Sequence, residues 1–137
     1  MALIKPGQLE PIISDKEMLD LINKYCQAIK SRNWDLLRLI ITQDCVWRWP
    51  GTNDESGTAI GTDAVIKQVS DMTRRVLDLQ LVKILYGVTG VAMSLHFQTV
   101  LSGEKVDEDM TTVCNLRGYL ISGINNYLSK VDELPVS

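Results

Sequence analysis

The sequence predicts a single α+β domain in which three helices pack on one face of an antiparallel sheet. Its 137 residues are enough for one domain and too few for two. Apolar residues recur at helical spacing in the first half of the chain and alternate with polar residues from Leu77 onward. With 45% apolar and 23% charged residues, the chain has the composition of an ordinary globular domain. We expect an arm over residues 1–13, the domain over 14–130 and a tail over 131–137.

The first helix is predicted to begin at Ser14 and to end near Lys30. Ser14 and Glu17 have the spacing of a capping box, in which each side chain binds the other residue's backbone N–H. Ile13 can pack on Met18, one turn inside the helix. Tyr25 is expected to point inward, because it belongs to an apolar stripe made of Met18, Leu21, Ile22, Tyr25 and Ile29.

Two shorter helices are predicted to follow. Asn33 begins the second, which continues through Trp34, Leu37 and Ile41. Residues 51–61 are rich in turn formers and form a loop with room for a short strand. After it, Thr62 is expected to cap the third helix, with Arg74 and Arg75 in its last turn, where cations suit the helix dipole. The buried stripe of this helix consists of Val65, Ile66, Val69 and Met72.

Strand patterns account for most of the remaining chain. Between the second and third helices, a period of two over Cys45 to Trp49 predicts a strand that ends at Pro50. Later alternation predicts four more strands over residues 77–85, 90–101, 106–116 and 119–128. Ser102 and Gly103 separate two long alternating runs, which is typical of a tight hairpin. The result is a meander of four or five strands.

Alternation also sorts the side chains of each strand between the two faces of the sheet. In strand 90–101 the apolar phase of Val91, Met93, Leu95 and Phe97 should face the helices, which leaves His96 on the outer face. In the next strand the more apolar phase carries Glu108 and Thr112 inward. In the last strand, apolarity alone does not decide which phase faces the helices.

Composition and charge argue against several classes of function. The net charge is -3, and Arg74 with Arg75 is the longest basic run, so nucleic acid and anionic membranes are unexpected partners. The three cysteines are far apart and are expected to be reduced thiols of a cytoplasmic protein. A single histidine offers too few ligands for a transition metal, and no glycine-rich phosphate motif follows a strand. We expect no cofactor, and no segment is long enough in apolar residues for a membrane span or a signal peptide.

Four runs of sequence resemble a known family when they are taken in order. They are YCQAIKSRNWDLL from Tyr25, DCVWRWPG from Asp44, SGTAIGTDAV from Ser56 and LISGINNYLS from Leu120. Together they resemble the nuclear transport factor 2-like superfamily, in its SnoaL-like polyketide cyclase and ketosteroid isomerase branch, over about residues 14–130. The resemblance implies a cystatin-like α+β barrel, in which a cone-shaped, mostly antiparallel sheet wraps around a long first helix. It also implies a ligand pocket in the cone and homodimers that pair through the outer face of the sheet.

The ketosteroid isomerase-like pattern has a helix tyrosine, a carboxylate before the Pro-Gly turn and a protonated acid on a later strand. Matched residue by residue, Tyr25 takes the first position, Trp49 the second and Thr112 approximately the third. An indole cannot accept a proton, so the resemblance argues against steroid isomerisation by that mechanism. The same matching places Asn125 inward on the last strand, together with Gly123 and Tyr127.

SnoaL-like cyclases are described as using an acid/base aspartate and a histidine, so the remaining acids and the single histidine are candidates. One of the three consecutive acids 107–109 must point inward, and the register selects Glu108; the competing interpretation is a solvated sheet edge. His96 suits proton transfer near neutral pH, but alternation places it outside. The candidate catalytic residues are Tyr25, Asn125, Glu108 and His96. The candidate substrate-binding residues are Trp47, Trp49, Met93, Leu95, Phe97, Thr112 and Tyr127.

Three hypotheses for function remain open. The first is a small cofactor-free isomerase, cyclase or hydratase acting on an apolar, oxygenated metabolite that resembles a polyketide, terpenoid or steroid. A cone filled by Trp49, Met93 and Phe97, with no cavity of at least ~300 Å³, would argue against it. The second is a binding module for a hydrophobic small molecule, which the indole of Trp49 favours. The third is a dimeric adaptor that binds proteins through an outer face carrying Ser94, His96 and Gln98.

Overall fold

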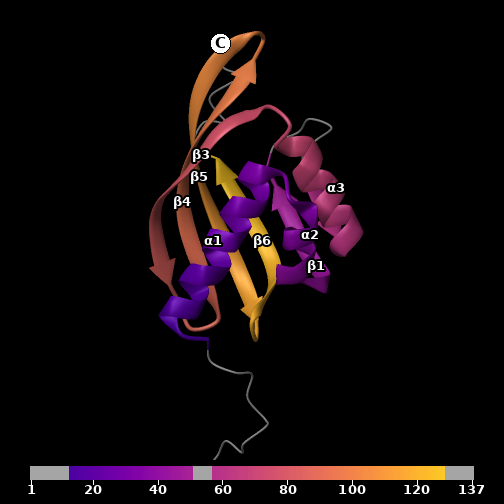
Figure 1. The fold of residues 1–137 in the computed structure, drawn as a ribbon, viewed down its shortest axis with the longest axis vertical. Helices are drawn as coiled ribbons and strands as arrows, with labels where there is room; N and C mark the ends of the chain where they lie inside the picture. The colour runs from indigo at the N-terminus through magenta and orange to yellow at the C-terminus, as the bar shows by residue number, and fades with distance from the viewer. Residues whose placement is uncertain (1–12, 51–56, 129–137) are drawn as a thin grey trace, which may run out of the picture.

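A computed structural model describes residues 13–50 and 57–128, which form three helices and six strands (Figure 1). The expected arm and tail, and most of the loop after Pro50, lie outside the described residues. The helices are α1 (Asp15–Ser31), α2 (Trp34–Ile40) and α3 (Thr62–Met72). The strands are β1 (Ile41–Trp49), β2 (Gly57–Ile60), β3 (Val76–Tyr86), β4 (Gly90–Leu101), β5 (Glu104–Arg117) and β6 (Leu120–Leu128).

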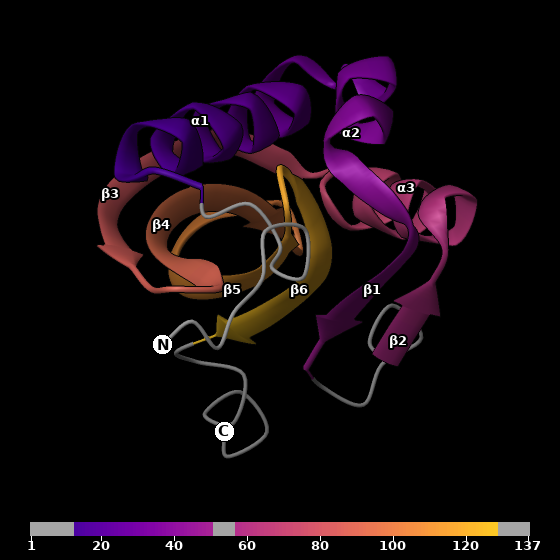
Figure 2. The same cartoon turned by 90° about the horizontal axis from the view of Figure 1, so that it is seen from below.

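All six strands belong to one curved sheet with the order β2-β1-β6-β5-β4-β3. Neighbouring strands are antiparallel except β1 and β6, which run parallel. Figure 2 shows β3 to β6 curling into an incomplete ring beneath α1, with α2 and α3 beside β1 and β2. The predicted α+β class with a strongly curved, mostly antiparallel sheet is confirmed. The strand predicted over Cys45 to Trp49 is part of β1, and the short strand for which the following loop had room is β2 at the edge of the sheet.

Helix α1 provides one wall of the core, and its predicted start is confirmed. The Glu17 backbone N–H donates to the Ser14 hydroxyl at 3.1 Å, and the Ser14 N–H donates to the Glu17 carboxylate at 3.0 Å. The helix ends at Arg32, whose φ of 53° is left-handed and stops the helix. Its buried stripe contains every residue predicted for it, including Tyr25, and the β4 side chains predicted to face the helices are also buried.

The ends of the two shorter helices differ from the prediction. Ile41 is the first residue of β1 rather than part of α2. Gly61, with φ of 96°, is the N-cap of α3 and gives it no side-chain cap, while the Thr62 hydroxyl donates to the Thr42 carbonyl at 3.1 Å. Helix α3 ends at Met72, so Arg74 and Arg75 lie in the link to β3 and not in the last helical turn.

Glycine occurs at a tight hairpin turn of the sheet and at one of its register shifts. Ser102 and Gly103, with φ of 53° and 81°, form the predicted tight turn between β4 and β5. The β5–β6 register shifts between Asn115 and Leu116, beside Gly123. A Cβ at Gly123 would lie 3.1 Å from Asn115 Nδ2, so this close approach suits glycine. Because the shift adds one residue to β6, the buried phase changes from Ile121 before it to Ile124 and Asn126 after it.

Among the described residues, no helix is long and apolar enough to cross a membrane.

Candidate functional site

The cavity lies between α1, the C-terminal end of α3 and the concave face of the sheet, and it has a volume of about 230 Å³. Its floor consists of buried side chains from α1 and from several strands, namely Tyr25, Trp47, Leu79, Leu95, Phe97, Glu108 and Asn126. Its mouth is formed by half-buried or exposed residues, among them Trp49, Pro50, Met72, Arg74 and Arg75. The cone therefore has the expected pocket at its open end.

The cavity volume of about 230 Å³ lies below the ~300 Å³ at the low end of typical small-molecule sites. Trp49 and Phe97 line the cavity instead of filling it, and Met93 lies buried behind its wall. An apolar cavity of about 150 Å³ holds a benzene ring. The cavity therefore has room for a molecule of at least one ring, and it is open at its mouth.

Tyr25 is the hydrogen-bond donor that α1 contributes to the floor. Its side chain is buried, and its hydroxyl is hydrogen-bonded to the indole of Trp47 on β1. Burial is the main cause that raises the Tyr25 pKa well above 10, and the Trp47 hydrogen bond lowers it by a smaller amount. The phenol therefore stays protonated at neutral pH. Because the Trp47 N–H donates to Tyr25 Oη, the Tyr25 O–H is left to donate to a ligand oxygen.

Trp47 and Trp49 form an aromatic wall between the floor and the mouth. They are two residues apart on β1, so their side chains share one face of the strand. Their rings stack with centroids 5.5 Å apart and an interplanar angle of 15°. Trp47 is buried and Trp49 half-buried, as expected for neighbours that lead from the floor to the mouth. Both predicted positions in the pocket are confirmed.

Asn126, rather than Asn125, is the inward asparagine of β6. The Thr112 hydroxyl donates to Asn126 Oδ1 at 2.9 Å, and Asn126 Nδ2 donates to the Arg48 carbonyl at 2.8 Å. These bonds fix the amide, and Asn126, which lines the cavity, keeps a second N–H on Nδ2 as a donor. The match to the ketosteroid isomerase-like pattern placed Asn125 here, together with Gly123 and Tyr127, in a single uninterrupted phase of the strand. Gly123 was the available signal, since an isolated glycine within a strand marks a bulge.

Glu108 is the carboxyl group of the floor, as the strand register predicted. It is 8% exposed, whereas the side chains of Asp107 and Asp109 are 61% and 73% exposed. Unbroken pairing of β4 with β5, in which Glu108 lies opposite Phe97, maintains this alternation. The middle acid of the triplet therefore enters the cavity while its neighbours remain on the outer face.

His96 lies on the outer face and has no part in the cavity. Its Nδ1 lies 2.9 Å from Asp109 Oδ1, and its Nε2 lies 3.5 Å from Asp107 Oδ1. The hydrogen bond to Asp109 raises the pKa of His96, and Asp107 adds to the effect. The predicted outward orientation is confirmed, and with it the candidate role of His96 as a catalyst in the pocket loses its geometric basis.

Three other predicted residues do not line the cavity. Thr112 is fully buried and acts through its bond to Asn126, and Met93 is packed in the core. Tyr127 is 59% exposed on the outer face, because the shift at Gly123 turned it outward together with Asn125. Conversely, sequence reasoning missed Arg74 and Arg75 at the mouth, because it assigned both to the last turn of α3.

Within residues 13–50 and 57–128, the cysteines are buried thiols and the metal-ligating side chains are dispersed. All three cysteines are buried and unpaired, and burial raises the pKa of Cys26 and of Cys45 to about 11. Burial also raises the Cys114 pKa. These thiols are therefore protonated near neutral pH. No three His, Cys, Asp or Glu side chains in these ranges gather in a way that could hold a metal ion.

Comparison with known proteins identifies the fold. No family model and no curated protein sequence matches the chain. A Xanthomonas campestris protein of unknown function with a cystatin-like fold is 19% identical, with 85% of this chain and 94% of that protein covered and a TM-score of 0.76. An NTF2-like protein from Burkholderia xenovorans is 15% identical, with 85% and 92% covered and a TM-score of 0.71. TerC, co-crystallised with polyporic acid, is 13% identical, with 87% and 96% covered and a TM-score of 0.73.

These neighbours show that the chain has the NTF2-like fold, which is also described as cystatin-like. The fold that the sequence runs suggested is therefore confirmed. The narrower resemblance to the SnoaL-like branch stays a prediction, because sequence identities below 20% carry the fold and not the activity.

Proposed function

We propose that the protein is a cofactor-free isomerase or lyase that acts by acid-base chemistry on a small, apolar, oxygenated metabolite. The observation that carries this proposal is the composition of the cavity floor. Two hydrogen-bond donors, Tyr25 and Asn126, and one carboxyl group, Glu108, come from three different elements to a floor that is otherwise apolar. Such a set of convergent polar groups in an apolar pocket is typical of a binding or active site.

The three groups can divide the work of enolisation between them. A substrate carbonyl oxygen accepts hydrogen bonds from the Tyr25 O–H and the Asn126 N–H. Ionised Glu108 removes a proton from the carbon beside the carbonyl, and the C–H electron pair forms the enolate. The two donors stabilise the negative charge that develops on oxygen. Glu108 then returns the proton to the same carbon or, where a second C=C bond extends the enolate to a dienolate, to the far carbon of that bond, which moves the double bond and gives isomerisation. Where the β-carbon carries a leaving group, the enolate electron pair forms the new C=C bond and the leaving group departs, which gives elimination.

The size of the cavity narrows the substrate class. The volume of about 230 Å³ favours a one-ring or short-chain carbonyl compound over the polyketide-, terpenoid- or steroid-like molecules first considered. A cyclase that closes several rings would need more room. TerC has been co-crystallised with polyporic acid, which supports a ligand-binding role for this fold without naming the ligand of this chain.

Solvent deuterium exchange tests the proposed chemistry without knowledge of the natural substrate. Phenylacetone is incubated with the protein in D₂O, and loss of its α-proton signals is followed by NMR. We expect the wild type to accelerate exchange, and Glu108→Gln to slow the catalysed rate by about 100-fold or more. His96→Gln, on the outer face, is the matched control and should exchange at the wild-type rate. Exchange that is independent of Glu108 would contradict the proposal.

A binding module without catalysis is the second candidate. Its specific support is Trp49, which occupies the position where the ketosteroid isomerase-like pattern has its proton-shuttling carboxylate. A pure binding module should bind phenylacetone with equal affinity in the wild type, Glu108→Gln and His96→Gln, and it should catalyse no exchange. Binding affinity for phenylacetone and its rate of deuterium exchange therefore distinguish an enzyme from a binding module.

We also propose that the protein is a homodimer and that it works in a reducing compartment such as the cytoplasm. On the outer face, the exposed side chains of Val82 and Tyr127 border a shallow groove with Ser94 and Thr111. A second copy that covers this groove would remove two large apolar side chains from water.

The three unpaired cysteines support the reducing compartment.

A further inference from the structure

The mouth of the cavity carries more positive than negative charge, although the whole chain has a net charge of -3. Asp71, at the end of α3, binds Lys67 at 3.1 Å and Arg74 at 2.8 Å. The hydrogen bond from Lys67 is the main cause that lowers the Asp71 pKa, and the charges of Arg74 and Arg32 contribute. This single carboxylate is therefore already compensated by its neighbours.

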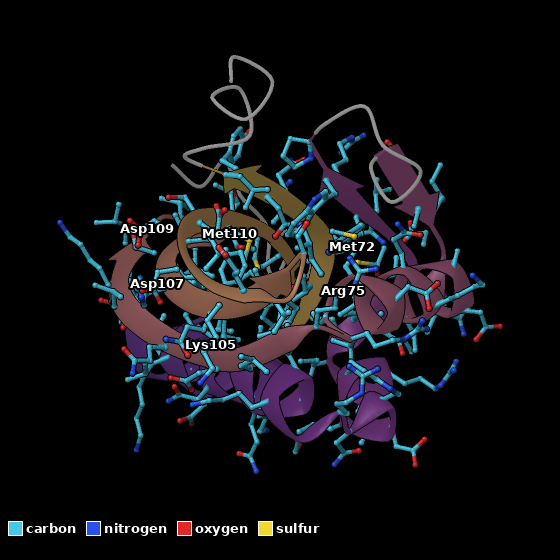
Figure 3. The ribbon with its side chains drawn as sticks, turned by 90° about the horizontal axis from the view of Figure 1, so that it is seen from above. Met72, Arg75, Lys105, Asp107, Asp109 and Met110 are labelled. Atoms are coloured by element: carbon cyan, nitrogen blue, oxygen red, sulfur yellow. The ribbon has the colours of Figure 1, made fainter. Side chains whose placement is uncertain are left out.

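Arg75 is a cation at the mouth whose guanidinium binds no other described side chain or backbone group. Arg32 is already hydrogen-bonded at the C-terminal end of α3. It donates to the Ser70 carbonyl and hydroxyl at 3.1 and 3.0 Å and to the Thr73 hydroxyl at 3.3 Å. Within residues 13–50 and 57–128, the exposed guanidinium of Arg75 has neither an ion-pair nor a hydrogen-bond partner. Figure 3 shows Arg75 beside Met72, on the opposite side of the ring from Asp107 and Asp109.

The backbone fixes the position from which this side chain extends. The Thr99 hydroxyl of β4 donates to the Arg75 carbonyl at 3.2 Å, and the Val76 N–H donates to the Thr73 carbonyl at 3.1 Å. Both Arg75 and Thr99 line the cavity. The guanidinium therefore starts from an anchored point at the rim, where it can meet a group that protrudes from the cavity.

Charge also differs between the two ends of the cavity. Glu108 is on the buried floor, whereas Arg74 and Arg75 are at the exposed mouth. An anionic group on a ligand would be attracted by the guanidinium of Arg75 at the mouth, whereas the floor holds the carboxyl group of Glu108 and offers it no cation. The favourable orientation for a singly charged acid places its apolar part inside and its carboxylate at the rim, where a guanidinium can bind both oxygens.

We propose that the ligand of this cavity is a small amphiphilic carboxylate whose anionic group pairs with Arg75. The proposal rests on the proposed function only in assuming that the cavity binds a metabolite. It adds that the metabolite is an acid, such as an aryl or short-chain keto acid, and that Arg75 selects it. Catalysis by Glu108 is not required for this selection.

Three probes of equal length and different charge test the proposal: 3-phenylpropionate, 3-phenylpropanamide and 3-phenylpropylamine. Binding is followed by the fluorescence of Trp47 and Trp49, which line the cavity. We expect the wild type to bind the carboxylate more tightly than the amide by about 3- to 5-fold, the size of an exposed ion pair. We expect Arg75→Ala to remove this preference, Arg75→Lys to keep most of it, and added salt to weaken it.

Arg38→Ala is the matched control, because Arg38 on α2 pairs with Asp63 and does not line the cavity. Equal affinity for the acid and the amide, tighter binding of the amine, or a preference that survives Arg75→Ala would each overturn the role of Arg75 while leaving the cavity a binding site. Failure of all three probes to bind the wild type would instead contradict the proposed function and this inference with it.

Discussion

At the scale of single residues, two adjacent asparagines provide a direct comparison. Asn126 holds hydrogen bonds to Thr112 and to the Arg48 carbonyl, while Asn125 is half-buried beside it. We predict that Asn126→Ala lowers the free energy of unfolding by about 1–3 kcal/mol, because it leaves the buried Thr112 hydroxyl without its partner. Asn125→Ala should change it by less than about 0.5 kcal/mol. Urea denaturation measures both, and equal losses would contradict the assigned β6 register.

His96 provides a second prediction at this scale, because it is the only histidine in the chain. Its pKa is raised, mainly by Asp109 and then by Asp107. Its contribution to stability is therefore fully present below the ordinary pKa of the histidine and is lost as pH rises through the higher pKa of the folded state. In an NMR titration, Asp109→Asn should lower the pKa of His96 more than Asp107→Asn does. The reverse order would contradict the contacts seen on the outer face.

Residue-level predictions from sequence succeeded where a strand is regular. Alternation placed Phe97 and Glu108 inward and His96 outward, because the β4–β5 register is unbroken. The family match that placed Asn125 and Tyr127 inward is wrong at both residues, because the register shifts beside Gly123, where Gly123 and Asn115 approach closely. Burial on one face thus follows from sequence only as far as the next bulge.

At the scale of elements, the start of α1 tests how local sequence fixes a helix. We predict that Ser14→Ala costs about 1 kcal/mol of stability, because it removes the acceptor for the Glu17 N–H. Ser14→Asp, which restores an acceptor, should recover most of the loss. Thermal unfolding measures the effect. An unchanged midpoint in Ser14→Ala would mean that tertiary packing alone fixes this helix end.

Helix and strand ends were predictable only where a local hydrogen bond decides them. The capping box of Ser14 and Glu17 and the turn at Ser102 and Gly103 are local, and both were predicted. The start of α3 depends instead on Gly61, whose N–H donates to the Cys45 carbonyl of β1 at 2.8 Å. The parallel pairing of β1 with β6 joins strands far apart in the sequence, so no local pattern could indicate it.

At the scale of the whole molecule, the outer face predicts self-association. A homodimer would have twice the chain mass of 15.4 kDa, and light scattering coupled to gel filtration measures that mass directly. We predict that the double variant Val82→Lys, Tyr127→Lys elutes as a monomer, because the added lysines of the two copies would repel each other across the dimer interface. Leu39→Lys, at an exposed site on α2, should leave the dimer intact. A wild-type monomer would contradict the homodimer.

The overall shape was more predictable than the volume it encloses. The order of the sequence runs from Tyr25 to Leu120 indicated the fold, and solved structures with the same architecture support it. The volume depends on how Trp47, Trp49 and Phe97 pack, and residue types alone do not specify such packing. The expected positions of Tyr25 and Glu108 at the cavity are confirmed, because they depend on helix and strand periodicity and not on how the aromatic side chains pack.

The central claim is that the cavity floor binds a carbonyl oxygen between Tyr25 and Asn126, with Glu108 facing the adjacent carbon. The most direct test is a crystal structure of the protein soaked with phenylacetone. We predict that the ketone oxygen lies within about 3.2 Å of both Tyr25 Oη and Asn126 Nδ2. A cavity that stays empty, or a ketone oxygen that points to the mouth and away from these two donors, would contradict it.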